Sequence, residues 1–542
     1  MQVDNLEEAI NKWRHALGSN NVITDAQALA PYSICTTPAR RVIPAVLFPG
    51  SEDDVRVIVL IAARYNIPLY PISTGHNWGY GSANPVVDGC VVVDLSKMNR
   101  ILDFDAELGI VTLEPGVTQG QLRTYLDESR LAFLVPVTGA GPTCSLIGNT
   151  LERGYGITPY PDHFGAMTSL HAVLPDGTLY RGALTEMGGA LIDKIFKWGI
   201  GPYLDGLFCQ GAFGIVTQMT ITLAPAHEHM TAFFFSISND CDLERIVDAE
   251  RDVLMSLGSM TSSINLMNPQ RMLSMLIPYP GDTAIKHSIA EEDVRKLAHQ
   301  YGVGAWSGVG AVYGDKEIVR AAISTIKKKL GRSVTRLIFM APHHARIAKR
   351  ILNFLPGQHM QRLWTLADRL DATLQILEGR PSEVALPLAY WKSGQPAIGS
   401  ARNPAFDGCG LIWYAPLVPM KASAVRILVR IVSRVCSEYD IDPLITLTSL
   451  SHRCFDCTVP ILYDKTSPEA EDAAMACFHA LFIAGQEQGF LPYRLGVQTM
   501  DLIARQQTPS WRLGEMLKTA VDPSLIISPG RYCRMGAHPA SH

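Results

Sequence analysis

Two glycine-rich segments constrain the fold of this chain more than any other feature. The first, Pro71-Ile-Ser-Thr-Gly-His-Asn-Trp-Gly-Tyr-Gly81, continues from a short apolar run that predicts a β-strand. Glycine lets a backbone turn tightly, and successive N–H groups of such a turn form a concavity for phosphate oxygens. The alternative is an ordinary surface turn. The second segment runs from Gly139 to Gly156, and a loop this rich in glycine inside a compact domain typically wraps a ligand.

The second segment does not fit the dinucleotide-binding turn of a Rossmann fold. That turn needs the pattern G-x-G-x-x-G within a βαβ unit, followed by an acidic residue about 20 positions further on. Cys144 stands where the third glycine would be, and no such βαβ unit follows. The sequence therefore predicts a ligand-binding fold of a different kind.

Length and composition narrow the protein class. A chain of 542 residues is too long for one hydrophobic core, so we expect two or three domains. A net charge of −4 argues against a nucleic-acid partner, which would require a basic face. No run of about 18 apolar residues predicts a membrane span, and the polar start lacks an apolar signal region. These features predict a cytoplasmic protein without membrane contact.

The cysteines do not resemble a disulfide framework. Eleven are scattered along a large chain, which favours reduced thiols. Cys454 and Cys457 form a single C-x-x-C, for which zinc ligands, a redox pair and bystander thiols are the alternatives. Bystander thiols are favoured because no second pair is present, so we predict no metal site.

The apolar periodicity indicates an α+β organisation. Helices are predicted at Glu52–Tyr65 and Gln119–Glu128, and Asp176-Gly177 between two apolar runs predicts a β-hairpin. From about residue 230, strands alternate with long helices, which predicts an antiparallel sheet with helices on one face. We expect a ligand-binding domain at residues 1–229, a second domain at 230–490, and a C-terminal segment at 491–542 that returns to the first.

Five longer segments carry a resemblance. They are Gly75-His-Asn-Trp-Gly-Tyr-Gly81, Ile147-Gly-Asn-Thr-Leu-Glu-Arg-Gly-Tyr-Gly-Ile-Thr-Pro-Tyr-Pro-Asp-His163, Gly201-Pro-Tyr-Leu-Asp-Gly-Leu-Phe208, Phe213-Gly-Ile-Val-Thr217, and Asp522-Pro with Ile527-Ser-Pro-Gly-Arg531. In this order they resemble the vanillyl-alcohol oxidase and p-cresol methylhydroxylase family of FAD-linked oxidoreductases. The similarity is strong over residues 40–225, thin through the middle, and present again over 490–532.

The resemblance implies a non-Rossmann FAD-binding domain of two subdomains, with residues 230–490 as a cap over the flavin ring. It implies that the first glycine-rich turn holds the FAD diphosphate and that both glycine-rich segments and the C-terminal segment line the cofactor. The implied cofactor-binding residues are Ser73, Thr74, Gly75, His76, Asn77, Gly79, Gly148, Asn149, Glu152, Gly154, Gly156, Gly214, Ile215, Cys457 and Arg531.

The phenol-oxidising members of this family hold their substrate as a phenolate between two tyrosines and an arginine. The matching residues are Tyr80, Tyr493 and Arg494. An arginine is always charged, and with two phenol donors it stabilises an oxyanion. A phenolate pushes electron density to its para carbon, so that a benzylic hydride can leave to flavin N5. The alternatives are that Tyr80 only packs on the flavin and that Arg494 pairs with an acid.

Two departures from the family pattern affect the expected chemistry. Val137 stands where family members place an aspartate beside the flavin, whereas the nearby Asp162 belongs to a different motif. The family's covalent flavin link lies near Cys457, with His452 close by in the sequence. His76 matches the histidine that related flavoproteins bond to the flavin. A bond to His76 is favoured over no covalent bond, and over Cys457 or His452.

We therefore expect an FAD-dependent oxidase or dehydrogenase that removes a hydride from a 4-alkylphenol or a 4-hydroxybenzylic alcohol. Its electrons would pass to oxygen, a cytochrome or another acceptor, and it would form a homo-oligomer. Val137 and His76 favour an alternative, the same fold acting on a hydroxy acid, a sugar or a specialised metabolite. A further alternative is a flavin-binding subunit without catalysis.

Overall fold

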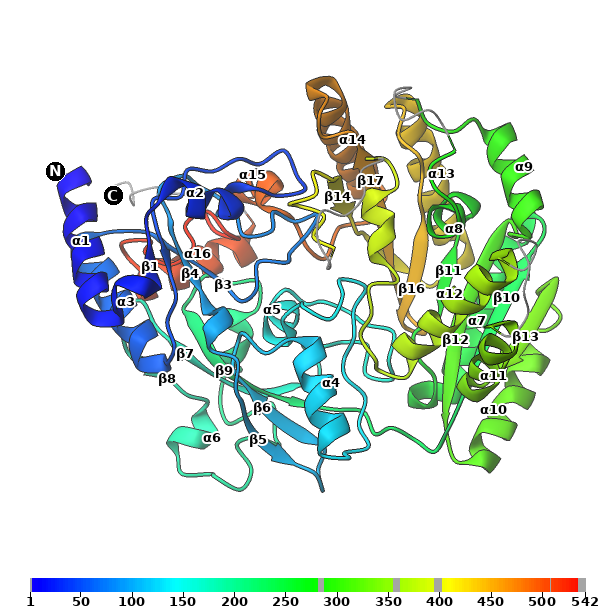
Figure 1. Ribbon diagram of the computed structural model, residues 1–542, viewed down its shortest axis with the longest axis horizontal. Helices are drawn as coiled ribbons and strands as arrows, with labels where there is room; N and C mark the ends of the chain where they lie inside the picture. The colour runs from blue at the N-terminus through cyan, green and yellow to red at the C-terminus, as the bar shows by residue number, and fades with distance from the viewer. Residues whose placement is uncertain (1, 281–286, 354–360, 394–401, 507, 535–542) are drawn as a thin grey trace.

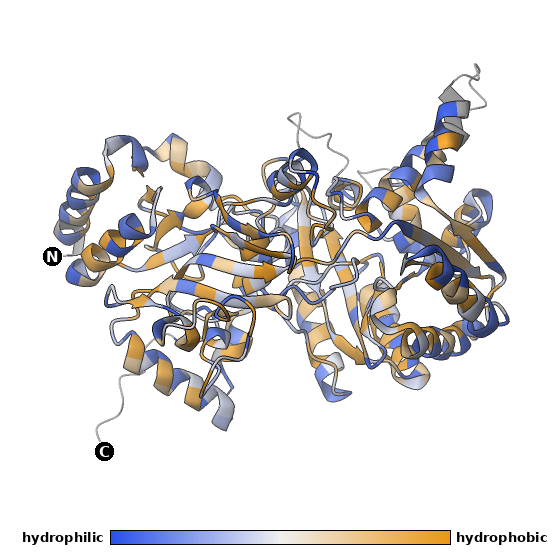
Figure 2. Ribbon diagram, turned by 90° about the horizontal axis from the view of Figure 1, so that it is seen from below, coloured by the Kyte–Doolittle hydropathy of each residue, from blue (hydrophilic) through white to orange (hydrophobic). Residues whose placement is uncertain are grey.

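Three β-sheets follow one another along the chain, each with its own helices (Figure 1). The computed structural model of the protein describes residues 2–280, 287–353, 361–393, 402–506 and 508–534. The first two sheets lie in one half of the molecule and the third in the other. Figure 2 shows apolar residues along the strands and hydrophilic residues on many outward sides of the helices, as burial of one helix face requires.

The first sheet has four strands in the order β1-β2-β4-β3, of which β2, β4 and β3 are parallel. Its strands and helices are β1 (Val22–Ile23), β2 (Val46–Leu47), β3 (Leu69–Ile72), β4 (Val91–Asp94), α1 (Gln2–Leu17), α2 (Ala26–Leu29) and α3 (Glu52–Tyr65). Helix α3 has the predicted bounds because Ser51 caps its start, accepting a bond from the Asp54 N–H, and Asn66 ends it in the left-handed conformation.

The second sheet is antiparallel, with the order β5-β6-β9-β7-β8. Its elements are β5 (Ile101–Asp105), β6 (Ile110–Leu113), β7 (Met167–Val173), β8 (Leu179–Tyr180), β9 (Ile215–Thr222), α4 (Gln119–Glu128), α5 (Leu146–Leu151) and α6 (Ala183–Glu186). The predicted hairpin is present: β7 pairs with β8 across a turn in which Gly177 has φ +81°.

The third sheet has eight strands, in the order β13-β10-β12-β11-β16-β17-β14 with β15 paired to β17, and all its pairs are antiparallel. Its strands are β10 (His229–Ile237), β11 (Asn265–Met267), β12 (Trp306–Gly314), β13 (Arg336–Met340), β14 (Gly410–Tyr414), β15 (Leu417–Pro419), β16 (Thr446–Ser451) and β17 (Cys454–Tyr463). The helices of this half are α7 (Leu243–Leu257), α8 (Pro269–Leu276), α9 (Glu291–Tyr301), α10 (Lys316–Lys329), α11 (Pro342–Asn353), α12 (Gln361–Leu377), α13 (Ala422–Glu438) and α14 (Pro468–Glu487).

The two faces of this sheet have different neighbours. Four helices, α7, α10, α13 and α14, bury one face in the largest apolar cluster of the described residues. The prediction of helices on one face holds for these four, whereas α8, α11 and α12 cover part of the opposite face. They do so because that face carries a second, smaller set of apolar side chains, including Ala232, Val309 and Tyr313.

The C-terminal segment returns to the first half of the molecule (Figure 1). It contains α15 (Asp501–Ala504) and α16 (Pro509–Val521), and Ile527 forms a parallel bridge with Leu69 at the edge of β3. A buried ion pair between Lys518 and Asp522 fixes the turn before this bridge. We propose the domain boundaries at 229 and 490, because the third sheet begins at His229 and its last helix ends at Glu487.

The structure also bears on the cysteines. All eleven are free thiols. Cys454 and Cys457 lie three residues apart on strand β17, so their side chains point to opposite faces and do not form a pair. No group of three or more potential metal ligands occurs among the described residues. In the same part of the chain, no helix is both long and apolar enough to cross a membrane.

Candidate active site

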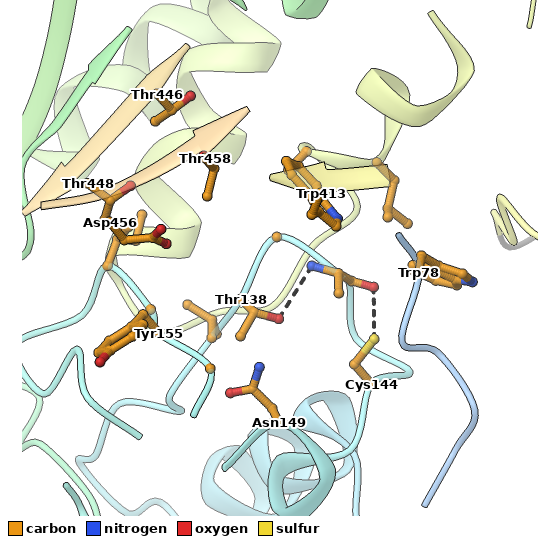
Figure 3. A pocket seen from close by; sticks show the side chains of 18 of the residues that line it. Trp78, Thr138, Cys144, Asn149, Tyr155, Trp413, Thr446, Thr448, Asp456 and Thr458 are labelled. Atoms are coloured by element: carbon orange, nitrogen blue, oxygen red, sulfur yellow. Dashed lines mark hydrogen bonds between the residues drawn. The ribbon is translucent and has the colours of Figure 1, made fainter. Parts of the chain in front are cut away.

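One cavity of about 830 Å³ lies where the glycine-rich segments, the third sheet and the C-terminal segment meet. Figure 3 shows side chains from β14, β16 and β17 on one side of it, and Thr138, Cys144 and Asn149 on the other. This position places the predicted ligand-binding loops opposite the third sheet.

The first glycine-rich turn forms one wall of the cavity, with Ser73, Thr74, Gly75, His76 and Asn77 among the lining residues. Gly75 has φ +70°, which bends the chain sharply at the end of β3. Within the described part of the chain, the backbone N–H groups of residues 74–77 have no hydrogen-bond acceptor. Adjacent unpaired N–H groups at a cavity wall fit the predicted diphosphate site.

Gly79, at the end of the same turn, has a structural role instead. Its φ is +79°, and a Cβ atom there would lie 2.1 Å from Cδ1 of Trp413 on β14. Its N–H donates to Oγ1 of Thr36 at 2.7 Å. Gly79 therefore fixes the turn against the cap sheet and does not line the cavity.

His76 lines the cavity and is held from two sides. Its Nδ1 lies 3.1 Å from the Thr143 hydroxyl, and its ring stacks on Trp78 with 5.0 Å between centroids. Burial lowers the pKa of His76, although the contact with Thr143 opposes this. The imidazole is therefore neutral near pH 7, with Nε2 left for another partner.

The second glycine-rich segment forms the facing wall, with Gly148, Asn149, Glu152, Gly154 and Gly156 among its lining residues. Helix α5 begins at its cap Ser145 and brings Gly148 against the first turn, where a Cβ would meet Oγ of Ser73 at 3.1 Å. At Gly156, a Cβ would lie 2.5 Å from the carbonyl oxygen of Val137. The glycines are thus required for the close approach of backbone segments that shapes the cavity.

The remaining predicted residues divide into two groups. Gly214 and Arg531 line the cavity. The side chains of Ile215 and Cys457 are fully buried in apolar clusters and do not line it. His452 lies in the turn between β16 and β17, also away from the lining.

Tyr80, Tyr493 and Arg494 converge on the cavity, although more than 400 residues separate Tyr80 from the other two in sequence. The guanidinium carbon of Arg494 lies 4.0 Å from the centre of the Tyr80 ring, a cation–π contact. Tyr493 packs edge-on against Tyr155 at 5.3 Å. Burial raises the pKa of both Tyr80 and Tyr493, so that both hydroxyls stay protonated and can donate.

Glu152 links two arginines of the site. It accepts a bond from Arg531, and its Oε2 lies 3.3 Å from Nε of Arg494. Arg494 also donates to the side-chain oxygen of Asn77, and Arg531 to the Tyr70 hydroxyl at 2.9 Å. Burial would lower the pKa of Arg494, but Glu152 and the tyrosines raise it, so the guanidinium remains charged. Two cations sharing one carboxylate leave a positive charge facing the cavity.

Asp456 is a site residue that the sequence analysis missed. It is buried on β17, one position before Cys457, and its side chain lies in the cavity (Figure 3). Burial raises the pKa of Asp456 to about 7, although Arg494 opposes this, and Oδ1 has no hydrogen-bond partner among the described residues. Val137, which stands where the family places an aspartate, is fully buried and lines the same cavity. Asp456 supplies a carboxyl group to this cavity from strand β17 instead.

Comparisons with known proteins agree with this geometry. Residues 43–183 match the model of the FAD binding domain family. The chain is 36% identical over 537 residues to the 1'-carboxy-chondrochloren decarboxylase of Chondromyces crocatus, covering 98% of each chain. It is 30% identical over 531 residues to the 4-cresol dehydrogenase [hydroxylating] flavoprotein subunit of Pseudomonas putida, covering 97% of this chain and 95% of the relative.

The chain belongs to the vanillyl-alcohol oxidase and p-cresol methylhydroxylase family. A solved structure of p-cresol methylhydroxylase with substrate bound superimposes with a TM-score of 0.86 at 28% identity, covering 99% of this chain and 98% of that one. The α+β fold predicted from the sequence is confirmed. As a member of this family, the chain is an FAD-dependent oxidoreductase.

FAD fits the residues of this family member. The free N–H groups of the first turn are suited to a diphosphate, and the glycines remove side chains that would fill the cavity. Arg531 and Glu152 form a charged pair on the wall beside Tyr70. Ile215 and Cys457 offer no side chain to the cavity.

Proposed function

We propose that this oxidoreductase removes a hydride from the benzylic carbon of a para-substituted phenol, either a 4-alkylphenol or a 4-hydroxybenzylic alcohol. The observation that carries the proposal is the convergence of Tyr80, Tyr493 and Arg494 in one cavity whose lining has more arginines than carboxylic acids. The name of the Pseudomonas putida relative, a 4-cresol dehydrogenase, supports the same substrate class.

The three residues bind the substrate oxygen as a phenolate. The charged guanidinium of Arg494 and the two tyrosine hydroxyls stabilise an oxyanion in a site of low dielectric. The phenolate donates electron density through the ring to the benzylic carbon. The hydrogen then leaves with both electrons of the C–H bond as a hydride, and the substrate becomes a neutral quinone methide. Bound FAD supplies the acceptor for the hydride.

Asp456 accepts the proton that the phenol loses on binding. Its carboxyl lies in the same cavity as Arg494, and its pKa of about 7 suits a group that takes up a proton near neutral pH. Asp456 forms no ion pair at contact distance among the described residues, whereas each oxygen of Glu152 lies beside an arginine.

We propose the first glycine-rich turn, Glu152 and Arg531 as the FAD-holding residues, with His76 as the residue bonded covalently to FAD. A neutral imidazole is a competent nucleophile, and burial keeps His76 neutral. The burial of Cys457 in the apolar core, together with its raised pKa, counts against a bond there. Acid precipitation tests this: flavin should pellet with the wild type and stay in solution with His76→Ala. Flavin that pellets with His76→Ala would place the bond elsewhere, and flavin that never pellets would mean no covalent bond.

Bound FAD would pass the electrons on to oxygen or to a protein acceptor such as a cytochrome. The Pseudomonas putida relative is named as a flavoprotein subunit, which supports a partner protein. We also propose that the chain forms a homo-oligomer. Stopped-flow reoxidation by oxygen and by a cytochrome c separates the two acceptors, and light scattering gives the oligomeric state.

Binding of 4-nitrophenol tests the phenolate site without turnover. Near pH 7, a large part of 4-nitrophenol is neutral in solution, and the protein should bind all of it as the yellow phenolate. Arg494→Met should remove this colour change, whereas Arg453→Met, at an exposed turn outside the cavity, should keep it. Binding of the neutral form by the wild type would contradict the proposed site.

A further inference from the structure

Besides Arg494 and Arg531, a further guanidinium lies in the wall of the cavity, away from the phenolate residues. Arg271 lies in the first turn of helix α8, directly after strand β11, and it lines the cavity. Asn268 caps this helix, accepting a bond from the backbone N–H of Arg271. Arg271 is half-buried at the cavity wall, and the helix cap fixes its backbone.

Arg271 has no carboxylate partner among the described residues. Its guanidinium makes one hydrogen bond there, a long one of 3.4 Å to Oγ of Ser274, although it carries five N–H donors. Burial lowers the pKa of Arg271 to about 10, with no neighbouring charge to oppose it. A half-buried guanidinium without an anion partner is unfavourable, so a ligand that supplies an anion would stabilise it.

The charges that line the cavity leave Arg271 without a partner. The lining contains two carboxylic acids, Glu152 and Asp456. Glu152 serves Arg494 and Arg531, and Asp456 is coupled to Arg494. The cavity therefore has an excess of positive charge at a place that the phenolate does not require.

A row of polar side chains extends from the phenolate residues toward Arg271. On neighbouring strands, Asp456 pairs with Thr448 and Thr448 with Asn265, and all three line the cavity. Two strand spacings separate Asp456 from Asn265, about 10 Å. The side-chain oxygens of Asn265 and of the adjacent Thr446 have no hydrogen-bond partner among the described residues. The part of the cavity between the phenolate residues and Arg271 can therefore hold a substrate side chain with polar groups.

We propose that Arg271 is an anion subsite, and that the substrate is a para-substituted phenol whose side chain carries a carboxylate. The phenol end is bound by Arg494 and the tyrosines, and the carboxylate pairs with the guanidinium of Arg271 in the bidentate geometry that arginine favours. This inference rests on the proposed phenol oxidation, and it adds the charge and the minimum length of the substrate.

The test uses the FAD-loaded protein and three sets of probes. They are 4-hydroxyphenyl alkanoates with side chains of two to six carbons, their methyl esters, and 4-alkylphenols of the same length. Anaerobic titration gives a Kd for each from the change in flavin absorbance. The acids whose side chain is long enough to reach Arg271 should bind at least about 30-fold more tightly than the matched esters, the ratio that 2 kcal/mol corresponds to.

Three variants separate binding from folding. Arg271→Met should abolish the preference for acids and leave the Kd of the esters unchanged, whereas Arg271→Lys should keep part of it. The melting temperature of Arg271→Met should equal or exceed that of the wild type, because a buried unpaired charge is removed. Arg320→Met, at an exposed site on α10 outside the cavity, is the matched control.

The outcomes distinguish this inference from the proposed function. If phenols of all three sets bind and bleach the flavin without a preference for acids, the anion subsite is wrong and the phenol oxidation stands. If Arg271→Met keeps the preference, or melts well below the wild type, Arg271 serves another, structural role. If no phenol of any set bleaches the flavin, the proposed function itself fails.

Discussion

The two faces of the eight-stranded sheet show how one backbone supports both stability and chemistry. On β17, Phe455 and Cys457 point into the apolar cluster beneath α13 and α14, whereas Asp456 and Thr458 point into the cavity. Successive strand residues alternate between faces, so neighbours in sequence have opposite environments. One face stabilises the fold, and the other can carry polar groups where it faces the cavity.

The largest expected effect is on the core face. Phe455→Ala removes a fully buried ring and should lower the free energy of unfolding by about 3–5 kcal/mol. The Kd for a phenol, measured on the protein that remains folded, should stay the same. A large change in that Kd at unchanged stability would mean that the two faces are not separate in function.

The next effect is on the cavity side. Arg494→Met should slow flavin reduction by a phenol about 10²- to 10³-fold, because the phenolate loses its counter-charge. Its free energy of unfolding should change far less than that of Phe455→Ala. Stopped-flow absorbance gives the first quantity and urea unfolding the second. A rate within about threefold of wild type would remove Arg494 from the site.

Asp456→Asn should change the pH dependence. Since Asp456 has a pKa of about 7, it is protonated below that pH and cannot accept the phenolic proton. The rate of flavin reduction should therefore rise about tenfold per pH unit below pH 7 and level off above it. In Asp456→Asn this rise in rate below pH 7 should be absent. A rise that persists in the variant would assign the titration to another group.

The smallest effect compares adjacent residues on the two faces. Cys457→Ala should lower the free energy of unfolding by about 1 kcal/mol and leave flavin content and rate unchanged. Thr458→Val keeps the side-chain volume and should change substrate affinity more than stability. Loss of bound flavin in Cys457→Ala would contradict the placement of this thiol in the core.

Features with local signals could be predicted from the sequence. The cap at Ser51, the Asp176-Gly177 hairpin and the first glycine-rich turn each depend on a few adjacent residues, and the structure has all three. The resemblance of the C-terminal motif to the family predicted that the C-terminal segment returns to the first domain. The bridge between Ile527 and Leu69 places it at the edge of the first sheet.

Features that depend on register or on distant partners could not be predicted. The expected cofactor contact at Cys457 carried an uncertainty of a residue or two, and a shift of one position along a strand exchanges the two faces, so that Cys457 lies on the core face. Asp456 was missed for the same reason. The importance of Arg271 lies in the absence of a carboxylate from distant parts of the chain, which no local pattern reports.

The central claim is that the cavity oxidises a substrate through its ionised phenol. The most direct measurement is anaerobic mixing of the FAD-loaded protein with matched pairs of 4-alkylphenols and their O-methyl ethers, with the oxidised-flavin absorbance recorded over time. The account predicts that the phenols bleach the flavin and the ethers do not, because an ether cannot form a phenolate. Equal bleaching by both, or bleaching only by a hydroxy acid or a sugar, would contradict it.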